Sequence, residues 1–206
     1  MTDSRAIQWA VWGGLFIIIA TIVALFFLRQ DEGSNQPLPV YGQVSDFLLT
    51  NQFGNAITLS NLQGKLCLAD VIFTRCPGPC AEMTRQMKAI QHQLLAEPIT
   101  YLSFTADPAF DTPQVLRRYQ ERFGIQSTNW HFLTGPKSEI YRLATNDFKF
   151  VVLENEPDVA AASGDLFVHS TKLVLLDQQG SVRGYFDGTE PDTPKKVSKA
   201  VKQLLR

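Results

Sequence analysis

A buried strand that runs directly into a turn with two cysteines constrains this chain more than any other feature. Residues 65–74 are almost continuously apolar and rich in β-branched and aromatic side chains, which is typical of a strand covered on both faces. A Pro-Gly-Pro turn follows, with Cys76 before it and Cys80 after it, and an amphipathic helix is expected to begin near Ala81. A strand that leads into a helix in this way predicts an α/β fold.

The helix after the turn carries one apolar stripe. The stripe recurs at steps of three and four residues and consists of Cys80, Met83, Met87, Ile90 and Leu94. Such a stripe faces the core, so we expect Cys80 to be partly buried and Cys76 to be more exposed.

The spacing of the two cysteines indicates a shared chemistry. Residues four apart lie about one helical turn apart, so both sulfur atoms can reach one ion, and they can also join in a disulfide. Unpaired N–H groups at a helix N-terminus favour a thiolate, and Arg75 adds positive charge, so the thiol pKa is expected to fall. The alternative is that both cysteines are ordinary small core residues, for which a Pro-Gly-Pro turn is an unusual place.

The rest of the chain alternates strands and helices. A hairpin is predicted at residues 47–50 and 56–59, and helices are predicted at residues 81–95, 113–123, 138–146 and 193–205. Further strands are predicted at residues 99–105, 130–134 and 181–187, the last of them an edge strand, and residues 166–176 are predicted to lead into another buried strand. This order predicts an α/β sandwich with a mixed sheet, which is the thioredoxin-like pattern.

The N-terminal segment predicts a membrane anchor. Residues 9–28 contain no charge, and twenty residues in a helix rise about 30 Å, which matches the thickness of a bilayer core. A cleaved signal peptide is the alternative, but the run is long for one and no small-x-small cleavage site follows it. The predicted organisation is an N-terminal tail at residues 1–8, a transmembrane helix at 9–28, a linker at 29–38 and one domain at 39–206.

Composition excludes several other classes of function. The chain has 19 basic and 20 acidic residues, a balance that gives no indication of nucleic-acid binding. Three cysteines are too few for a disulfide scaffold, and no second cysteine pair or histidine cluster indicates a zinc site. We expect Cys67 to be a buried packing thiol, His131 to be structural and His92 to be solvated. Thr112 is expected to cap the helix at 113–123, with Pro113 at its first position, and Asp111 to be a carboxylate in the cap region.

The segment at residues 73–80, with the sequence FTRCPGPC, resembles the metal-binding segment of the Sco/SenC family of thioredoxin-like copper proteins. Three further segments fit in order, and together they span residues 39–206: residues 39–50 with Gly64-Lys65, residues 107–113, and residues 167–170 followed by a hairpin. Ala81 and Arg75 depart from residues found in many members, but neither position is a ligand.

The resemblance implies that Cys76, Cys80 and His169 bind one copper ion, with His169 supplied by a loop. Two thiolates and one imidazole suit copper, because thiolates select Cu(I) and histidine also tolerates Cu(II). The resemblance further implies a protein in the bacterial inner membrane whose domain faces the periplasm. Its partner would be the copper-bearing subunit of a cytochrome c oxidase, to which it passes copper, or another copper carrier. Asp107 or Asp111 would then touch the site or a partner.

An enzyme is the rival interpretation, namely a periplasmic thiol–disulfide oxidoreductase that uses Cys76 and Cys80. Two observations count against it as the main role. The spacing is Cys-x-x-x-Cys and not Cys-x-x-Cys, and the segment at residues 168–171 lacks the proline that holds substrate peptides in related enzymes. We therefore expect a copper chaperone, and the two roles are compatible because copper loading needs both thiols reduced.

Overall fold

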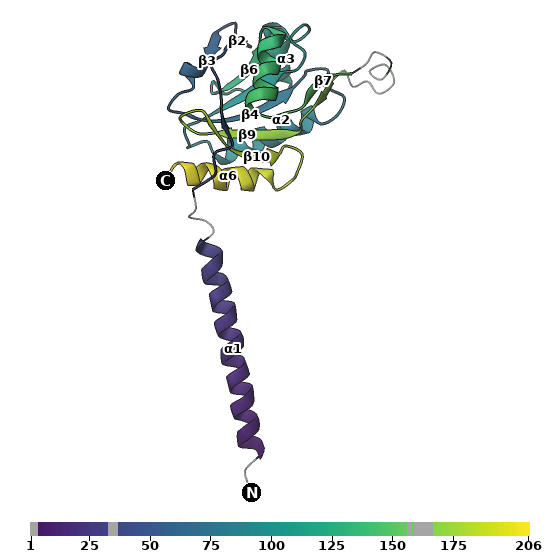
Figure 1. Ribbon diagram of the computed structural model, residues 1–206. Helices are drawn as coiled ribbons and strands as arrows, with labels where there is room; N and C mark the ends of the chain where they lie inside the picture. Colours follow the sequence, from purple (N-terminus) through teal and green to yellow (C-terminus); the bar gives the residue numbers. More distant parts are fainter. Residues whose placement is uncertain (1–3, 33–36, 156–157, 159–166) are drawn as a thin grey trace. The chain divides into compact units, whose positions relative to one another are not determined.

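The computed structural model describes residues 4–32, 37–155, 158 and 167–206, and the side chains of residues 4–7, 10, 26–32, 168 and 169 are not among those described. The chain divides into two compact units, residues 1–37 and residues 38–206 (Figure 1).

The first unit contains one helix, α1 (Ser4–Glu32), of 29 residues. Large apolar side chains, among them Trp9, Trp12 and Phe16, are exposed along it. In the part of the chain that the structure describes, no helix combines the length and the apolarity needed to cross a membrane. The transmembrane helix at residues 9–28 stays a prediction.

The second unit is built on a mixed sheet. Among the described residues, eight strands are hydrogen-bonded in the order β1, β10, β9, β4, β5, β6, β2, β3. Their bounds are Gly42–Gln43 (β1), Leu48–Asn51 (β2), Ala56–Thr58 (β3), Leu66–Ile72 (β4), Ile99–Thr105 (β5), Trp130–Thr134 (β6), Lys172–Leu176 (β9) and Ser181–Asp187 (β10). The central strands β4, β5 and β6 are parallel, and the remaining pairs are antiparallel.

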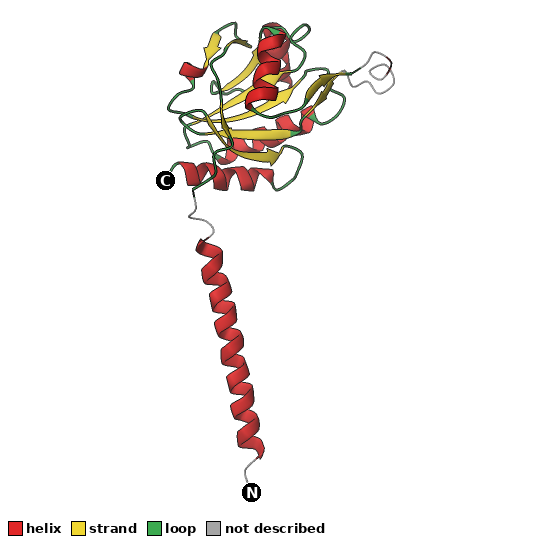
Figure 2. Ribbon diagram, in the orientation of Figure 1, coloured by secondary structure: helices red, strands yellow, loops and turns green. Residues whose placement is uncertain are grey.

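Helices cover both faces of this sheet (Figures 1 and 2). Helices α2 (Cys80–Gln93) and α6 (Thr193–Leu204) pack together on one face, and α3 (Pro113–Arg122) lies on the other. This arrangement explains why every residue of β4 and of β5 is buried, as a continuous apolar run predicts. The mixed α/β thioredoxin-like fold predicted from the sequence is therefore confirmed.

Most predicted elements are confirmed within a residue or two. They include the hairpin of β2 and β3, the strands at residues 99–105 and 130–134, and the helix that begins at Pro113. Thr112 caps that helix by accepting a hydrogen bond from the Val115 amide. The apolar stripe of α2, from Cys80 to Leu94, is buried as expected.

The segment at residues 166–176, predicted to lead into one buried strand, contains two. It forms β8 (Phe167–His169), which pairs with the unpredicted strand β7 (Val152–Glu154) in a separate sheet, and β9 of the large sheet. The break lies where the chain changes partners. The Ser170 amide donates a hydrogen bond to the carbonyl of Val151, just before β7. The carbonyl of the following residue, Thr171, accepts one from the amide of Gly188, just after β10.

Two smaller predictions are also corrected. Strand β10 is not an edge, because β1 pairs with its first residues and places Gly42 opposite Val182. The helix predicted at residues 138–146 is α4 (Lys137–Arg142) followed by a π turn, η2 (Leu143–Asp147), and Pro136 occupies its N-cap position. The Asp147 carboxylate accepts hydrogen bonds from Ser45 (3.0 and 2.6 Å), which ties the end of this turn to the start of the domain.

Candidate metal centre

The two site cysteines lie where β4 leads into α2. We call residues 73–80 the cysteine turn. The amide of Cys76 donates to the carbonyl of Phe73 (3.2 Å), and Cys80 is the first residue of α2. The α2 start is fixed by Met83, whose amide donates to the Pro79 carbonyl (2.9 Å). The turn therefore sits at the carboxyl end of the central strand.

The two thiols differ in exposure in the predicted order. Cys80 is 1% exposed, whereas Cys76 is half-buried against the core. Neither is in a disulfide, and their side chains share a hydrogen bond. The sequence prediction that they form one pair within reach of each other is confirmed.

The expected fall in thiol pKa is wrong for Cys80. The hydrogen bond with the Cys76 side chain, together with burial, raises the pKa of Cys80 above its ordinary value. A further contribution comes from the negative charge of Asp70, a fully buried residue of β4 that sequence reasoning did not single out. Burial and a neighbouring thiol outweigh the helix N-terminus here. Cys80 therefore keeps its proton until something that binds sulfur more strongly displaces it.

The predicted third ligand, His169, ends β8, and its backbone lies opposite Val152 of β7. The prediction that a loop supplies it is therefore corrected, since it comes from a strand of the small sheet. The side chain of His169 lies outside the described residues. Among the side chains that are described, no three His, Cys, Asp or Glu residues are grouped so as to hold a metal ion. The ligand set of Cys76, Cys80 and His169 remains a prediction.

Asp111 fastens the cysteine turn to the neighbouring strand. It is fully buried and accepts hydrogen bonds from the Thr74 amide (3.1 Å), the Thr74 hydroxyl (2.5 Å) and the Thr105 hydroxyl (2.5 Å). Burial raises the pKa of Asp111. Thr112 is the N-cap of α3, as predicted, and Asp111, next to it, bonds the cysteine turn and β5 through its side chain.

Asp107 supports the same turn through its charge. Its carboxylate pairs with the guanidinium of Arg75 at 2.5 Å, and that guanidinium also lies over the ring of Phe110 at 3.9 Å. Arg75, next to Cys76, is thus held by two residues of the loop that follows β5. Because parallel strands end at the same edge of a sheet, the loops after β4 and β5 meet here, a signal that the sequence already contained.

The remaining cysteine and histidines have the roles expected of them. Cys67 is 2% exposed, and burial raises its pKa to about 12, so it is a packing thiol. His131 lies in β6, half-buried, with Asn51 at 3.4 Å, and burial lowers its pKa. His92 is exposed on α2.

Tyr119 is a residue of the site region that sequence reasoning missed. Its hydroxyl contacts the hydroxyl of Thr84 (2.9 Å) and donates to the carbonyl of Cys80 (3.5 Å). It thereby connects α3 with the start of α2. Its place beside Leu116 on the buried side of α3 could have shown that it faces inward, but not which residue it meets.

Known proteins are similar to this chain in sequence and in fold. The SCO1/SenC family model matches residues 37–206. A SCO1 protein homolog of Bacillus subtilis is 35% identical over 171 residues, which is 82% of this chain and 85% of that protein. BsSco, described as having a disulfide switch and as a member of the Sco family of cytochrome c oxidase assembly proteins, superposes with a TM-score of 0.71 at 30% identity, covering 82% of this chain and 98% of that one. Yeast Sco1 with copper bound gives a TM-score of 0.64 at 25% identity, covering 78% and 89%.

Proposed function

Because the chain belongs to the SCO1/SenC family, we propose that it binds one copper ion through Cys76, Cys80 and His169 and delivers it to the copper centre of a cytochrome c oxidase. The observation that carries this proposal is the hydrogen-bonded pair of cysteine thiols at the junction of β4 and α2. Similar proteins are described as copper-bound and as oxidase assembly proteins.

The chemistry of the donor set fits copper as cargo. Two thiol sulfurs are the soft ligands that Cu(I) prefers, and an imidazole is accepted by both oxidation states. The raised pKa of Cys80 means that the metal must displace protons, so binding is coupled to proton release. A set of three ligands from the chain leaves room for a ligand of the acceptor, which a delivery protein needs.

The surrounding residues act by holding the turn. Asp111 keeps the Thr74 backbone against Thr105, and Asp107 restrains Arg75, so the two residues before Cys76 are fixed from the β5 side. Helix α2 fixes Cys80 from the other side. The thiols are thus positioned before any metal arrives, which lowers the conformational cost of binding.

A thiol–disulfide oxidoreductase is the second candidate, and the shared hydrogen bond between the thiols favours it. In that reaction Cys76 attacks a target disulfide, and Cys80 then displaces the target thiol. The pair gives up two electrons and two protons and closes a disulfide, and the target gains both. The half-buried Cys76 suits the attacking role better than Cys80, which is almost fully buried.

For the N-terminal unit we propose a membrane anchor at residues 9–28 that tethers the domain on the periplasmic side of the bacterial inner membrane, with residues 1–8 on the cytoplasmic side. The uncharged run of this helix and its two tryptophans support the proposal. Extraction of membranes with alkaline carbonate tests it. An anchored chain stays with the membranes, whereas release into the soluble fraction would contradict the anchor.

The proposed ligand set is tested by the stoichiometry and affinity of copper binding to the reduced full chain. We expect one copper per chain, affinity at least about tenfold weaker for His169→Ala, and no stable copper for the double variant Cys76→Ser/Cys80→Ser. His92→Ala is the matched control, because this exposed histidine lies on α2 away from the turn. If His169→Ala binds copper as the wild type does, the three-ligand site is wrong. If the wild type binds none while the two cysteines still cycle through a disulfide, the oxidoreductase is the better interpretation.

A further inference from the structure

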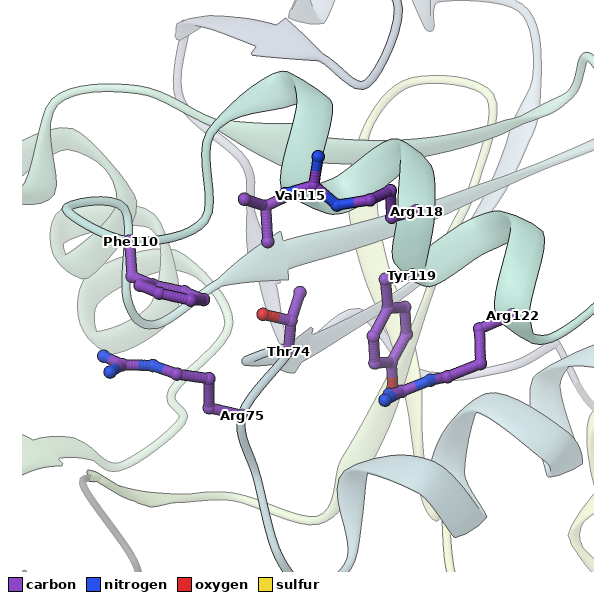
Figure 3. A pocket seen from close by; sticks show the side chains of 7 residues that line it. All are labelled: Thr74, Arg75, Phe110, Val115, Arg118, Tyr119 and Arg122. Carbon is purple, nitrogen blue, oxygen red and sulfur yellow. The ribbon is translucent and has the colours of Figure 1, made fainter.

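A pocket of about 290 Å³ opens directly beside the cysteine turn. It lies between the turn, the loop after β5 and helix α3 (Figure 3). The residues that line it are Thr74, Arg75, Phe110, Val115, Arg118, Tyr119 and Arg122. Phe110, Val115 and Tyr119 give the pocket an apolar floor, and the three arginines give it a cationic rim.

The charges on the rim are unequally satisfied. Arg75 pairs with Asp107. On helix α3, Arg117, which lies next to Arg118, pairs with Glu121 at 3.2 Å. Arg118 and Arg122 are both exposed, and within the described part of the chain neither makes an ion pair. The rim therefore carries two guanidinium groups whose charge the described domain leaves uncompensated.

Aromatic rings support two of the three guanidinium groups that line the pocket, those of Arg75 and Arg122. Arg122 lies over the ring of Tyr119 at 4.8 Å, and Arg75 lies over Phe110 at 3.9 Å (Figure 3). A guanidinium stacked on a ring keeps its N–H groups free at the edges, where they can bind both oxygens of a carboxylate. Phe110 is 42% exposed and offers an apolar surface beside them. The pocket thus suits a carboxylate carried on a short apolar segment.

The pocket is connected to both cysteines through their backbone. Thr74 and Arg75 immediately precede Cys76, and Tyr119 on the pocket floor donates a hydrogen bond to the carbonyl of Cys80. Anything seated in the pocket therefore lies against the residues that hold both thiols.

We infer that this arginine pocket is the docking site for an acidic segment of the protein that exchanges copper with the cysteine pair. The inference rests on the proposed function and names the chemistry of its partner. The positive charge of the pocket favours an acidic ligand. A protein is favoured over a small metabolite, because a delivery step needs the acceptor itself held next to Cys76. The two uncompensated arginines would steer an acidic acceptor to this side of the turn and fix its orientation.

The test is association of the reduced, copper-free full chain with the copper-free soluble domain of the copper-bearing oxidase subunit from the same organism, measured by titration calorimetry. The double variant Arg118→Gln/Arg122→Gln removes the uncompensated charges. Arg117→Gln is the control, since it removes one positive charge from the same helix at an arginine that is already paired with Glu121. Circular dichroism checks the fold of each variant, and copper stoichiometry is measured separately on each.

We expect the double variant to bind the domain roughly tenfold more weakly and to lose most of the salt dependence of binding, while Arg117→Gln binds as the wild type does. Equal affinity of the double variant and the wild type would overturn the inference, and so would a wild type that does not bind the domain. In either case a wild type that still loads one copper leaves the proposed copper site standing. Acetate is titrated in parallel by NMR. If it shifts the side-chain signals of Arg118 and Arg122 while the domain does not, the pocket is a small-anion site and the protein partner is wrong.

Discussion

Replacing Asp111 by alanine tests whether one buried carboxylate holds the cysteine turn in place. The change leaves the Thr74 amide and two threonine hydroxyls without their acceptor. The hydroxyls can rotate toward other groups, but the amide cannot, and an unsatisfied buried donor costs about 1–3 kcal/mol. Adding the lost hydroxyl contacts, we expect Asp111→Ala to reduce the unfolding free energy by about 3 kcal/mol, which lowers Tm by about 6–12 °C.

Asparagine at the same position separates hydrogen bonding from charge. The Thr74 amide and the Thr105 hydroxyl both donate to the same carboxylate oxygen, Oδ2, and an amide oxygen placed there still accepts both. The amide nitrogen then faces the Thr74 hydroxyl, which can turn to accept. We therefore expect Asp111→Asn to change the unfolding free energy at neutral pH by less than about 1 kcal/mol.

The pH dependence of stability has a definite sign. Burial raises the pKa of Asp111 in the folded state, so between its unfolded and folded pKa values the native state binds more protons than the unfolded state. The contribution of this group to the unfolding free energy therefore falls as pH rises through that window, and it stays low above it. Asp111→Asn removes this slope.

Chemical denaturation of the full chain, followed by circular dichroism at several pH values, measures the unfolding free energy of both variants and its dependence on pH. Asp46→Ala is the control, because this aspartate is exposed and its loss should change stability by no more than about 0.5 kcal/mol. If Asp111→Asn is as unstable as Asp111→Ala at neutral pH, the charge and not the hydrogen bonds holds the turn, and the reasoning fails.

Three further predictions concern single groups. Cys67 should resist alkylation in the native chain while Cys76 reacts, because burial raises the pKa of Cys67 to about 12; mass spectrometry that finds early labelling of Cys67 would contradict its burial. Copper affinity should rise with pH, since binding displaces the proton of Cys80, whose pKa is raised by the hydrogen bond with Cys76 and by burial, and calorimetry in two buffers should show proton release on binding. Asp187 has its pKa lowered to about 2 by hydrogen bonds, so its stabilising effect is present above the unfolded pKa and is lost as pH falls through about 2; acid titration of Asp187→Asn should show a flatter loss of stability there.

Local patterns were sufficient to predict most of the fold. The apolar run that became β4, the stripe of α2 and the Thr112-Pro113 helix start each depend on neighbours in sequence, and each was found. The division of residues 166–176 was not, because it depends on a change of partner at Ser170 and Thr171 that only the tertiary structure specifies. Strand β7 was missed for the same reason.

The site was predicted in part. Spacing and resemblance identified Cys76 and Cys80, but the predicted direction of the Cys80 pKa shift was wrong. That shift depends on the hydrogen bond with Cys76, on burial and on the charge of Asp70, which are set by the packed core. The sequence placed Asp111 near the site only through the resemblance. That its oxygens meet Thr74 and Thr105 follows from the parallel alignment of β4 with β5.

The position of β4 in the middle of the large sheet has a consequence for hydrogen exchange. All seven of its residues are buried, with β5 on one side and β9 on the other, so its amides exchange with solvent only when the sheet opens as a whole. A ligand that binds the native state alone slows such exchange as its occupancy rises. Since the cysteine turn begins one residue after β4, metal held there should protect amides throughout the central sheet, including many that no ion touches.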